Sequence, residues 1–247
     1  MPFTFSHPAA VLPATVLPKR FYSFTGLVVG SMAPDFEYFM RMEATSHYGH
    51  SISGIFWFDL IMGLFLAFLY HLLIRDVFIA NLPKVFRERL SPFCQFKWTS
   101  YFKKNWLIVF ISIIVGAATH ILWDGFTHLD GLFVNHLPYL QHSIKMFGPF
   151  PVYNVLQHLS TLIGGVAILI YVLKLPKGEE IKPAVSTINY WISILLISLL
   201  IMFFKVLSGL RFYTYHEPII VLITSLLIAL TVTSYLFRYK TFLQLVK

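Results

Sequence analysis

Residues 106–123 have the sequence WLIVFISIIVGAATHILW, and Asp124 follows them directly. The stretch contains no charged side chain and approaches the ~20 helical residues that are needed to cross a bilayer. Its polar side chains other than tryptophan are Ser112, Thr119 and His120. It predicts a transmembrane helix that ends at an imidazole and a carboxylate.

The composition of the whole chain fits a membrane protein. Of the 247 residues, 57% are hydrophobic and 12% are charged, and the mean hydropathy is +0.72. A soluble domain has about 45–50% apolar and about 25% charged residues. This difference excludes an ordinary soluble enzyme and a disordered chain.

Five stretches are long and apolar enough to span a bilayer, or nearly so. They are Ile52–Ile74, Trp106–Trp123, Ser160–Leu175, Ile188–Leu207 and Ile219–Phe237. The third is short, and we expect it to extend back to His158 or beyond. A sixth, Phe21–Ala33, is too short to cross at 1.5 Å per residue, and we expect Pro34 to end it. The predicted fold is an all-α polytopic membrane helical bundle with about five transmembrane helices and short N-terminal buried or re-entrant helices.

The distribution of basic residues predicts the orientation. Cations are frequent around residues 75–105 and 174–182 and in the C-terminal tail, whereas 124–157 and 208–218 each contain one. Cytoplasmic loops are rich in lysine and arginine, so we expect a multi-pass protein of the cell membrane with a cytoplasmic C-terminus. The net charge of +8 then reflects contact with anionic lipids, and no nucleic-acid partner is expected.

Three further expectations concern organisation. Residues 1–175 are predicted to form a metal-site membrane domain of two short N-terminal helices and three spans, and residues 176–247 a C-terminal pair of transmembrane helices. The opening of the chain has no basic and apolar pattern of a cleavable signal peptide. The single cysteine, Cys94, excludes an internal disulfide and a cysteine-rich metal motif.

The predicted orientation collects polar groups on one side. Nine of the ten histidines fall on or near the extracytoplasmic face, and only His71 lies near the inner one. Ionisable groups in or next to a membrane are costly, and they therefore indicate a functional site.

The sharpest local pattern is His120-Ile-Leu-Trp-Asp124-Gly-Phe-Thr-His128. Side chains four residues apart lie on one face of a helix, so His120 and Asp124 could bind the same metal ion. His128 could join them, or bind a neighbouring ion, if the helix continues. The alternative is a His–Asp hydrogen bond at the membrane interface.

A second pattern is Ser46-His47-Tyr48-Gly49-His50-Ser51. Its two histidines could supply ligands from the start of a helix. Alternatively, the stretch is an interfacial polar turn in which Ser51 or Ser53 caps the next helix.

Two more candidates lie near the N-terminus. Asp35 follows Pro34 and is either directed into a site or the N-cap of the next helix. His7, between Ser6 and Pro8, is by itself either a ligand or an exposed terminal residue.

Four stretches together resemble one family, a bacterial family of polytopic membrane proteins of unknown function. They are Pro2–Ala10 (PFTFSHPAA), Gly30–Glu37 (GSMAPDFE), Ser46–Ser51 (SHYGHS) and His120–His128 (HILWDGFTH). The resemblance runs from the start to about residue 170.

That family is similar, more distantly, to membrane-bound metal-dependent hydrolases and to the zinc-dependent phospholipase C and single-strand nuclease superfamily. Those proteins show an early histidine, an aspartate, a histidine and a His-x3-Asp pair in the same order, and they hydrolyse phosphodiesters. The resemblance implies a metal site made by His7, Asp35, His50, His120 and Asp124, with His128 or His158 completing the set.

The sequence departs from that pattern at two places. Glu37 stands where the hydrolases have aspartate. The later His-x3-Glu pair of the phospholipases is missing, because His142 is followed by Met146 and His158 by Leu162. One or two metal ions are therefore expected instead of three.

These features favour an integral membrane metal-dependent hydrolase of phosphoesters, with a lipid or lipid-linked substrate and membrane lipids as partners. Imidazole and carboxylate ligands without thiolate suit a divalent metal, zinc above all, with manganese or iron as alternatives. A different class is a non-enzymatic membrane protein, either a metal or small-solute permease or a metal-stabilised scaffold. Asp59 and His71 within the first span support the permease, because a transport path needs polar groups at membrane depth. The alternative for Asp59 is a paired structural residue.

Overall fold

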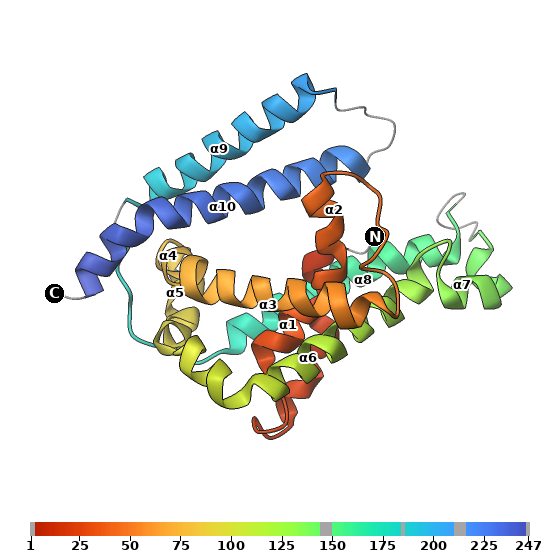
Figure 1. Ribbon diagram of the computed structural model, residues 1–247, viewed down its shortest axis with the longest axis horizontal. Coiled ribbons are helices and arrows are strands. Elements are labelled where there is room, and N and C mark those ends of the chain that lie inside the picture. Colours follow the sequence, from red (N-terminus) through yellow and green to blue (C-terminus); the bar gives the residue numbers. More distant parts are fainter. Residues whose placement is uncertain (1–2, 144–149, 184–185, 210–215, 246–247) are drawn as a thin grey trace. The chain divides into compact units, whose positions relative to one another are not determined.

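The computed structural model describes residues 3–143, 150–183, 186–209 and 216–245, and these residues form helices and no β-strand (Figure 1). Five helices are long and apolar enough to cross a membrane, which suggests a multi-pass membrane protein. They are Ile55–Ala80, Trp98–Thr127 (α6), Val152–Lys174 (α8), Thr187–Leu207 (α9) and His216–Arg238, the last within α10 (His216–Leu245). The all-α fold class and the five spans are confirmed, and the orientation stays a prediction.

The helices extend beyond the predicted apolar stretches. α6 starts at Trp98 instead of Trp106, with a kink at Asn105, and α8 starts at Val152, which confirms the expected extension past His158. A helix satisfies its own backbone hydrogen bonds in water as well as in lipid. Polar ends such as Lys103 and Lys104 therefore continue a helix that hydropathy alone cuts short.

The first span changes its helical type along its length. It comprises the π-helix η3 (Ile55–Asp59), α3 (Leu60–Leu69), the π-helix η4 (Tyr70–Ile74) and α4 (Arg75–Ala80). Asp59 at the end of η3 is fully buried, as expected for a carboxylate within a span.

The N-terminal region is helical in four short pieces. They are the 3-10 helix η1 (Thr4–Val16), α1 (Phe24–Gly30), the 3-10 helix η2 (Ala33–Asp35) and α2 (Phe36–Arg41). The prediction that Pro34 ends the apolar helix was wrong, because α1 ends at Gly30 and Pro34 lies in the first turn of η2, after Ala33. Proline is tolerated in the first turn of a helix, where its missing N–H would have no intrahelical partner.

The chain divides into two compact units. The first contains residues 1–36, 47–67 and 102–171, and the second contains 37–46, 68–101 and 172–247. The expected division at residue 175 stays a prediction.

Within the first unit, α1 packs directly against α6 through glycines. A Cβ at Gly116 would lie 2.7 Å from the backbone nitrogen of Ser31 and would also meet the carbonyl oxygen of Leu27. A Cβ at Gly30 would lie 2.8 Å from Cα of Ile113. Glycines let two backbones approach closely, as small residues do in membrane helix pairs.

The N-terminal helix η1 is fixed to α8 in the same way. Ser6 donates a hydrogen bond to the carbonyl oxygen of Thr161 (3.0 Å), and the Thr161 hydroxyl accepts one from the Phe3 N–H (3.0 Å). A Cβ at Gly164 would lie 2.8 Å from the Ser6 carbonyl oxygen. These contacts bury His7 in the unit.

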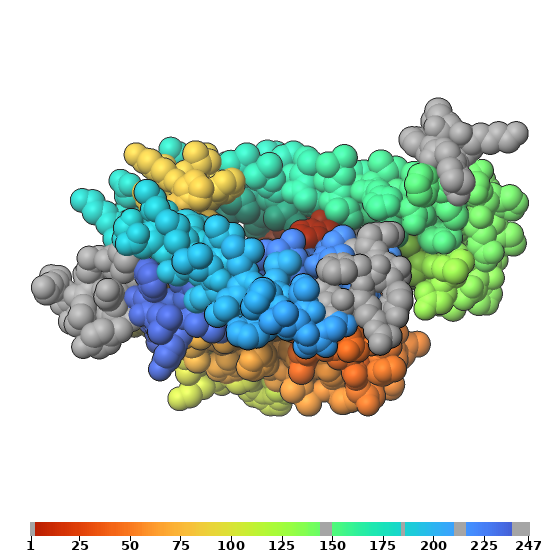
Figure 2. All heavy atoms as spheres, turned by 90° about the horizontal axis from the view of Figure 1, so that it is seen from above, coloured from red at the N-terminus to blue at the C-terminus, as the bar shows by residue number. Residues whose placement is uncertain are grey.

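In the second unit, α9 and α10 pack together around buried Tyr190, Ile194 and Ala229. The Tyr190 hydroxyl lies 3.2 Å from Ser234 Oγ. α9 is seen in light blue on the face drawn in Figure 2. Its large apolar side chains such as Leu196 and Phe204 are exposed, as expected for a surface in contact with lipid tails.

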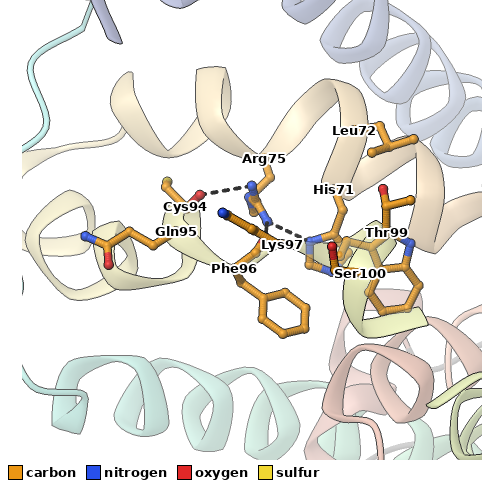
Figure 3. A pocket seen from close by; sticks show the side chains of 10 residues that line it. His71, Leu72, Arg75, Cys94, Gln95, Phe96, Lys97, Thr99 and Ser100 are labelled. Carbon is orange, nitrogen blue, oxygen red and sulfur yellow. Dashed lines mark hydrogen bonds between the residues drawn. The ribbon is translucent and has the colours of Figure 1, made fainter. Parts of the chain in front are cut away.

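The second unit also holds a pocket of about 510 Å³ beside η4 and the start of α6 (Figure 3). Its buried guanidinium, Arg75, donates to the carbonyl oxygens of Phe96 (2.7 Å) and Cys94 (3.1 Å) and to Asp76 (2.6 Å). Arg75 thus ties α4 to the 3-10 helix η5 (Ser91–Gln95), which follows α5 (Lys84–Leu90). It serves as a structural clamp for this loop.

Candidate metal centre

The candidate site is built around one turn of α6. His120 and Asp124 are four residues apart, lie on the same face of the helix and are both buried. The other two members, Asp35 and His50, come from η2 and from the turn before η3. Gly49 allows that turn to approach η2, because a Cβ there would lie 3.1 Å from the backbone carbon of Pro34.

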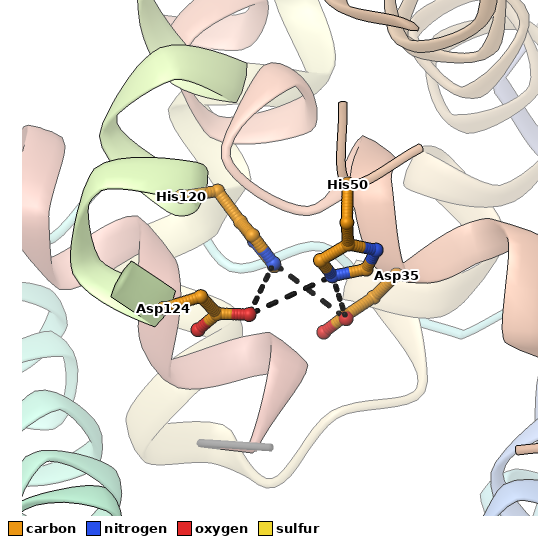
Figure 4. A group of neighbouring side chains, drawn as sticks. All are labelled: Asp35, His50, His120 and Asp124. Atoms are coloured by element: carbon orange, nitrogen blue, oxygen red, sulfur yellow. Dashed lines mark ion pairs between the residues drawn. The ribbon is translucent and has the colours of Figure 1, made fainter. Parts of the chain in front are cut away.

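Four side chains converge in this site (Figure 4). One donor atom from each of Asp35, His50, His120 and Asp124 lies within 4.8 Å of the others. His50 Nε2 is 3.4 Å from Asp35 Oδ1 and 3.6 Å from Asp124 Oδ2. His120 Nε2 is 3.6 Å from Asp35 Oδ1 and 3.3 Å from Asp124 Oδ2. This group could hold a metal ion.

These separations match ligands around one ion better than hydrogen bonds. N–H···O hydrogen bonds have donor–acceptor distances of about 2.7–3.2 Å. Two ligand atoms about 2.0–2.2 Å from a common zinc ion at tetrahedral angles are separated by about 3.3–3.6 Å. All four His–Asp distances lie between 3.3 and 3.6 Å. The donor set therefore fits a cation of this size.

The polar atoms of the group are otherwise poorly satisfied. Among the described residues, His120 Nε2, Asp35 Oδ1 and both carboxylate oxygens of Asp124 are buried without a hydrogen-bond partner. Buried polar groups in proteins nearly always have a partner. Two ionised carboxylates would also leave a charge of −2 that a divalent cation balances.

Two outer contacts orient the group. His120 Nδ1 lies 2.7 Å from the carbonyl oxygen of Ser31. A carbonyl oxygen only accepts, so Nδ1 donates. In the neutral ring, which is the form that binds metals, Nε2 then presents its lone pair to the centre of the group. Thr4 Oγ1 donates to Asp35 Oδ2 at 2.6 Å, which leaves Asp35 Oδ1 facing the histidines. Such second contacts fix the tautomer and orientation of metal ligands.

His7 lies beside this group. Its ring stacks on His120 with centroids 3.7 Å apart, and its Nε2 is 3.5 Å from Asp124 Oδ1. Asp124 thus directs one oxygen to the four-residue group and the other to His7. Burial and the neighbouring His120 lower the pKa of His7 to about 3, so its ring is neutral, which is the form that binds metals.

His128 is close to the group but oriented by its own helix. Its Nδ1 is 3.6 Å from Asp124 Oδ2 and 3.1 Å from the Asp124 carbonyl oxygen. Burial lowers the pKa of His128. The predicted roles of His7 and His128 as ligands stay predictions.

The charges within the group favour ionised carboxylates. Burial disfavours the ionised form of Asp35, but His120 and His50 outweigh it and hold the pKa of this carboxyl below its usual range. Burial also disfavours the charged form of His50 and by itself would lower its pKa. The carboxylates of Asp124 and Asp35 outweigh burial and raise the pKa of His50 to about 9. A cation that binds here replaces the His50 proton as the partner of the two carboxylates.

Other histidines of the sequence do not join the group. His47 and His158 are exposed. His136 and His142 are exposed too, and each ring lies close to the carbonyl oxygen four residues earlier, at 2.7 and 2.8 Å. Ser51 Oγ accepts a hydrogen bond from the Gly54 N–H (2.9 Å). The expected serine N-cap was wrong, because Gly54 is the N-cap of η3 and no side chain caps that helix.

Glu37 has a separate role. Its carboxylate accepts hydrogen bonds from Arg41 Nε (3.0 Å) and Ser46 Oγ (2.9 Å). These bonds explain why the longer acid at this position is buried and paired.

The contacts of Thr4 with Asp35 and of the Ser31 carbonyl with His120 were not predicted from the sequence. Thr4 lies in the N-terminal stretch that carried the resemblance, three residues before His7, but its partner Asp35 is 31 residues away. The Ser31 contact uses a backbone carbonyl, which no residue type reveals.

Thr4→Val is expected to weaken metal binding about 10–100-fold, because loss of an outer hydrogen bond to a ligand has effects of this size. Thr15→Val is the matched control, since the Thr15 hydroxyl donates only to Leu12 within the same 3-10 helix. Titration of both proteins with zinc against a competing chelator measures the difference. Equal affinities would show that Thr4 does not orient Asp35.

A comparison with protein families identifies the family of this chain. A family model described as Domain of unknown function (DUF4184) matches residues 1–235. The chain belongs to this family. The DUF4184 match extends well past residue 170, so the family includes the last two spans, which carried little signature in the sequence. No curated protein and no solved structure matches the chain significantly. The likeness to hydrolases and nucleases therefore rests on the order of the motifs alone.

Proposed function

We propose that this DUF4184 protein is an integral membrane metal-dependent hydrolase of phosphoesters. The observation that carries the proposal is the convergence of Asp35, His50, His120 and Asp124, with His–Asp separations of 3.3–3.6 Å. Three separate segments of the chain would not bring buried acids and imidazoles together without a chemical reason.

The ligand chemistry supports turnover. A zinc ion held there supplies Lewis-acid polarisation of a phosphoryl oxygen and makes water more acidic. Asp35, His50, His120 and Asp124 hold the ion, and His7 and His128 flank Asp124 as further nitrogen donors. His7, neutral at pH 7, is placed to bind a second ion.

Two histidines are the accessible members of the site. The side chains of His50 and His128 are 23% and 25% exposed, whereas those of His120 and Asp35 are fully buried. A phosphoester would therefore approach past His50 and His128. The buried side chains of His120 and Asp35 would stay in place during a reaction.

A metal-stabilised scaffold is the second candidate, and one observation favours it. Four protein ligands can complete a tetrahedron, whereas catalytic zinc sites keep one position open. Structural zinc sites, however, are built mostly from cysteine thiolates, and this group has none. The two candidates differ in turnover and not in metal content.

His120→Ala is expected to lose both bound metal and hydrolysis of bis(p-nitrophenyl) phosphate, by about 100-fold or more, since it removes a proposed ligand. His136→Ala removes an exposed histidine at the end of the short helix α7 (Leu132–His136) and should change neither. Metal content by mass spectrometry and the rate of nitrophenol release measure the two effects. Wild-type protein that binds metal without hydrolysis would support the scaffold, and wild-type protein without metal would refute both candidates.

A further inference from the structure

The segment 129–139, which follows the end of α6 at Thr127, exposes an unusual amount of apolar surface. It contains α7 (Leu132–His136) and leads into the 3-10 helix η6 (Pro138–Gln141). Leu129, Leu132 and Tyr139 are 62%, 64% and 71% exposed, and Leu137 is exposed too. These residues lie outside the candidate spans, so hydropathy windows do not account for them.

The segment is nevertheless firmly packed on its other side. Val134 is fully buried and forms a cluster with Leu140 and Val152. The Phe133 ring stacks on Phe126 with centroids 3.9 Å apart. The exposed leucines therefore belong to a fixed element and not to a loose loop that could turn them inward.

Its composition fits the membrane interface. Residues 129–142 contain no lysine or arginine and one acid, Asp130. Contiguous apolar side chains on a surface mark contact with a membrane or a partner, and tyrosine and leucine are both found at the boundary between headgroups and acyl chains. The segment continues directly from an apolar span, so the bilayer is the adjacent occupant.

The segment also touches the metal-centre turn. A Cβ at Gly125, the residue after Asp124, would lie 3.0 Å from Cδ2 of Phe133, and one at Gly131 would lie 2.9 Å from the backbone carbon of Gly125. Wherever residues 129–139 sit in the bilayer, Asp124 therefore sits close to the same depth.

We propose that residues 129–139 lie in the interfacial layer of the bilayer and hold the opening of the metal centre at the level of the lipid phosphates. The part of this proposal that concerns the metal centre and the lipid phosphates rests on the proposed function. It assigns phosphoesters carried by membrane lipids, in preference to water-soluble ones, as the substrate class.

Depth measurement tests the position without any activity. Leu132→Cys and Tyr139→Cys, made in a Cys94→Ser background, are labelled with a nitroxide in phosphatidylglycerol nanodiscs. For each label we measure the ratio of its collision rate with oxygen to its collision rate with a water-soluble nickel chelate. We expect this ratio to be at least about threefold higher than for a label at Glu179→Cys, which lies in an exposed charged loop. Nickel access equal to that control would overturn the proposal, and so would shielding from both reagents, which would indicate a protein partner or a second copy.

A pair of substrates tests the assignment. Leu132→Ser is compared with Val85→Ser, which makes a similar change at an exposed residue of α5. We expect Leu132→Ser to lose at least about tenfold in hydrolysis of phosphatidylglycerol vesicles while retaining hydrolysis of bis(p-nitrophenyl) phosphate. Equal losses on both substrates would overturn the lipid assignment. Wild-type protein that binds no metal and hydrolyses neither substrate would refute the proposed function and the assignment, while the depth result still decides the position.

Discussion

Purified Asp124→Asn protein is expected to bind a divalent metal at least about 100-fold more weakly than wild type, because losing a ligand exceeds the effect of losing an outer contact. Asp124 is the member of the group with the most nitrogen neighbours. Its Oδ2 faces His50, His120 and His128 at 3.6, 3.3 and 3.6 Å, and its Oδ1 faces His7 at 3.5 Å. The amide keeps the shape of the side chain but removes the charge and half of the acceptor capacity.

Asp130→Asn is the matched control, since Asp130 is exposed and lies on the loop that follows α6. It should bind metal as wild type does. Metal content after dialysis against a graded series of chelator concentrations measures both variants. If Asp124→Asn kept wild-type affinity, the His–Asp group would be a hydrogen-bonded cluster and not a metal centre.

Gly116→Ala is expected to destabilise the protein by about 3 kcal/mol and to weaken metal binding, because overpacking costs energy of this order. The added Cβ meets backbone atoms of Leu27 and Ser31 on α1 and its C-cap, which cannot move aside as a flexible side chain would. The separation of α1 from α6 would also draw the Ser31 carbonyl away from His120 Nδ1, one helical turn along. Fold stability and the metal centre are therefore coupled at this crossing.

Gly165→Ala adds the same methyl group to α8, where the atom that it would meet is Ser6 Oγ at 3.9 Å. That contact is ordinary, so the variant should unfold at the wild-type temperature and bind metal normally. Thermal unfolding in detergent, followed with and without zinc, compares the two variants. An unchanged midpoint for Gly116→Ala would mean that α1 and α6 do not pack this closely.

The spans could be predicted because they are local. Each depends on an unbroken apolar stretch whose length can be compared with the bilayer, and all five occur. The N-terminal region was harder. Its pieces α1, η2 and α2 are each seven residues or fewer, and such short helices are fixed by packing and not by propensity. The end of α1 at Gly30, ahead of Pro34, is one result of that packing.

The site was predictable in part for the same reason. His120 and Asp124 share a helical face whatever surrounds them, so their spacing indicated a pair. Asp35 and His50 lie in short turns, and only the order of motifs linked them to that pair.

The sequence by itself determined an all-helical chain with five apolar spans and one helix face that bears an imidazole and a carboxylate. Hydrophobic length and helical periodicity are properties of neighbouring residues, so no tertiary information was needed. The tertiary structure decided that η2 and the His50 turn meet that face at 3.3–3.6 Å and that Thr4 and the Ser31 carbonyl orient it. Those distances depend on backbone approach at Gly30, Gly49 and Gly116, where the absence of a side chain shows its effect only when the facing helix or turn is in place.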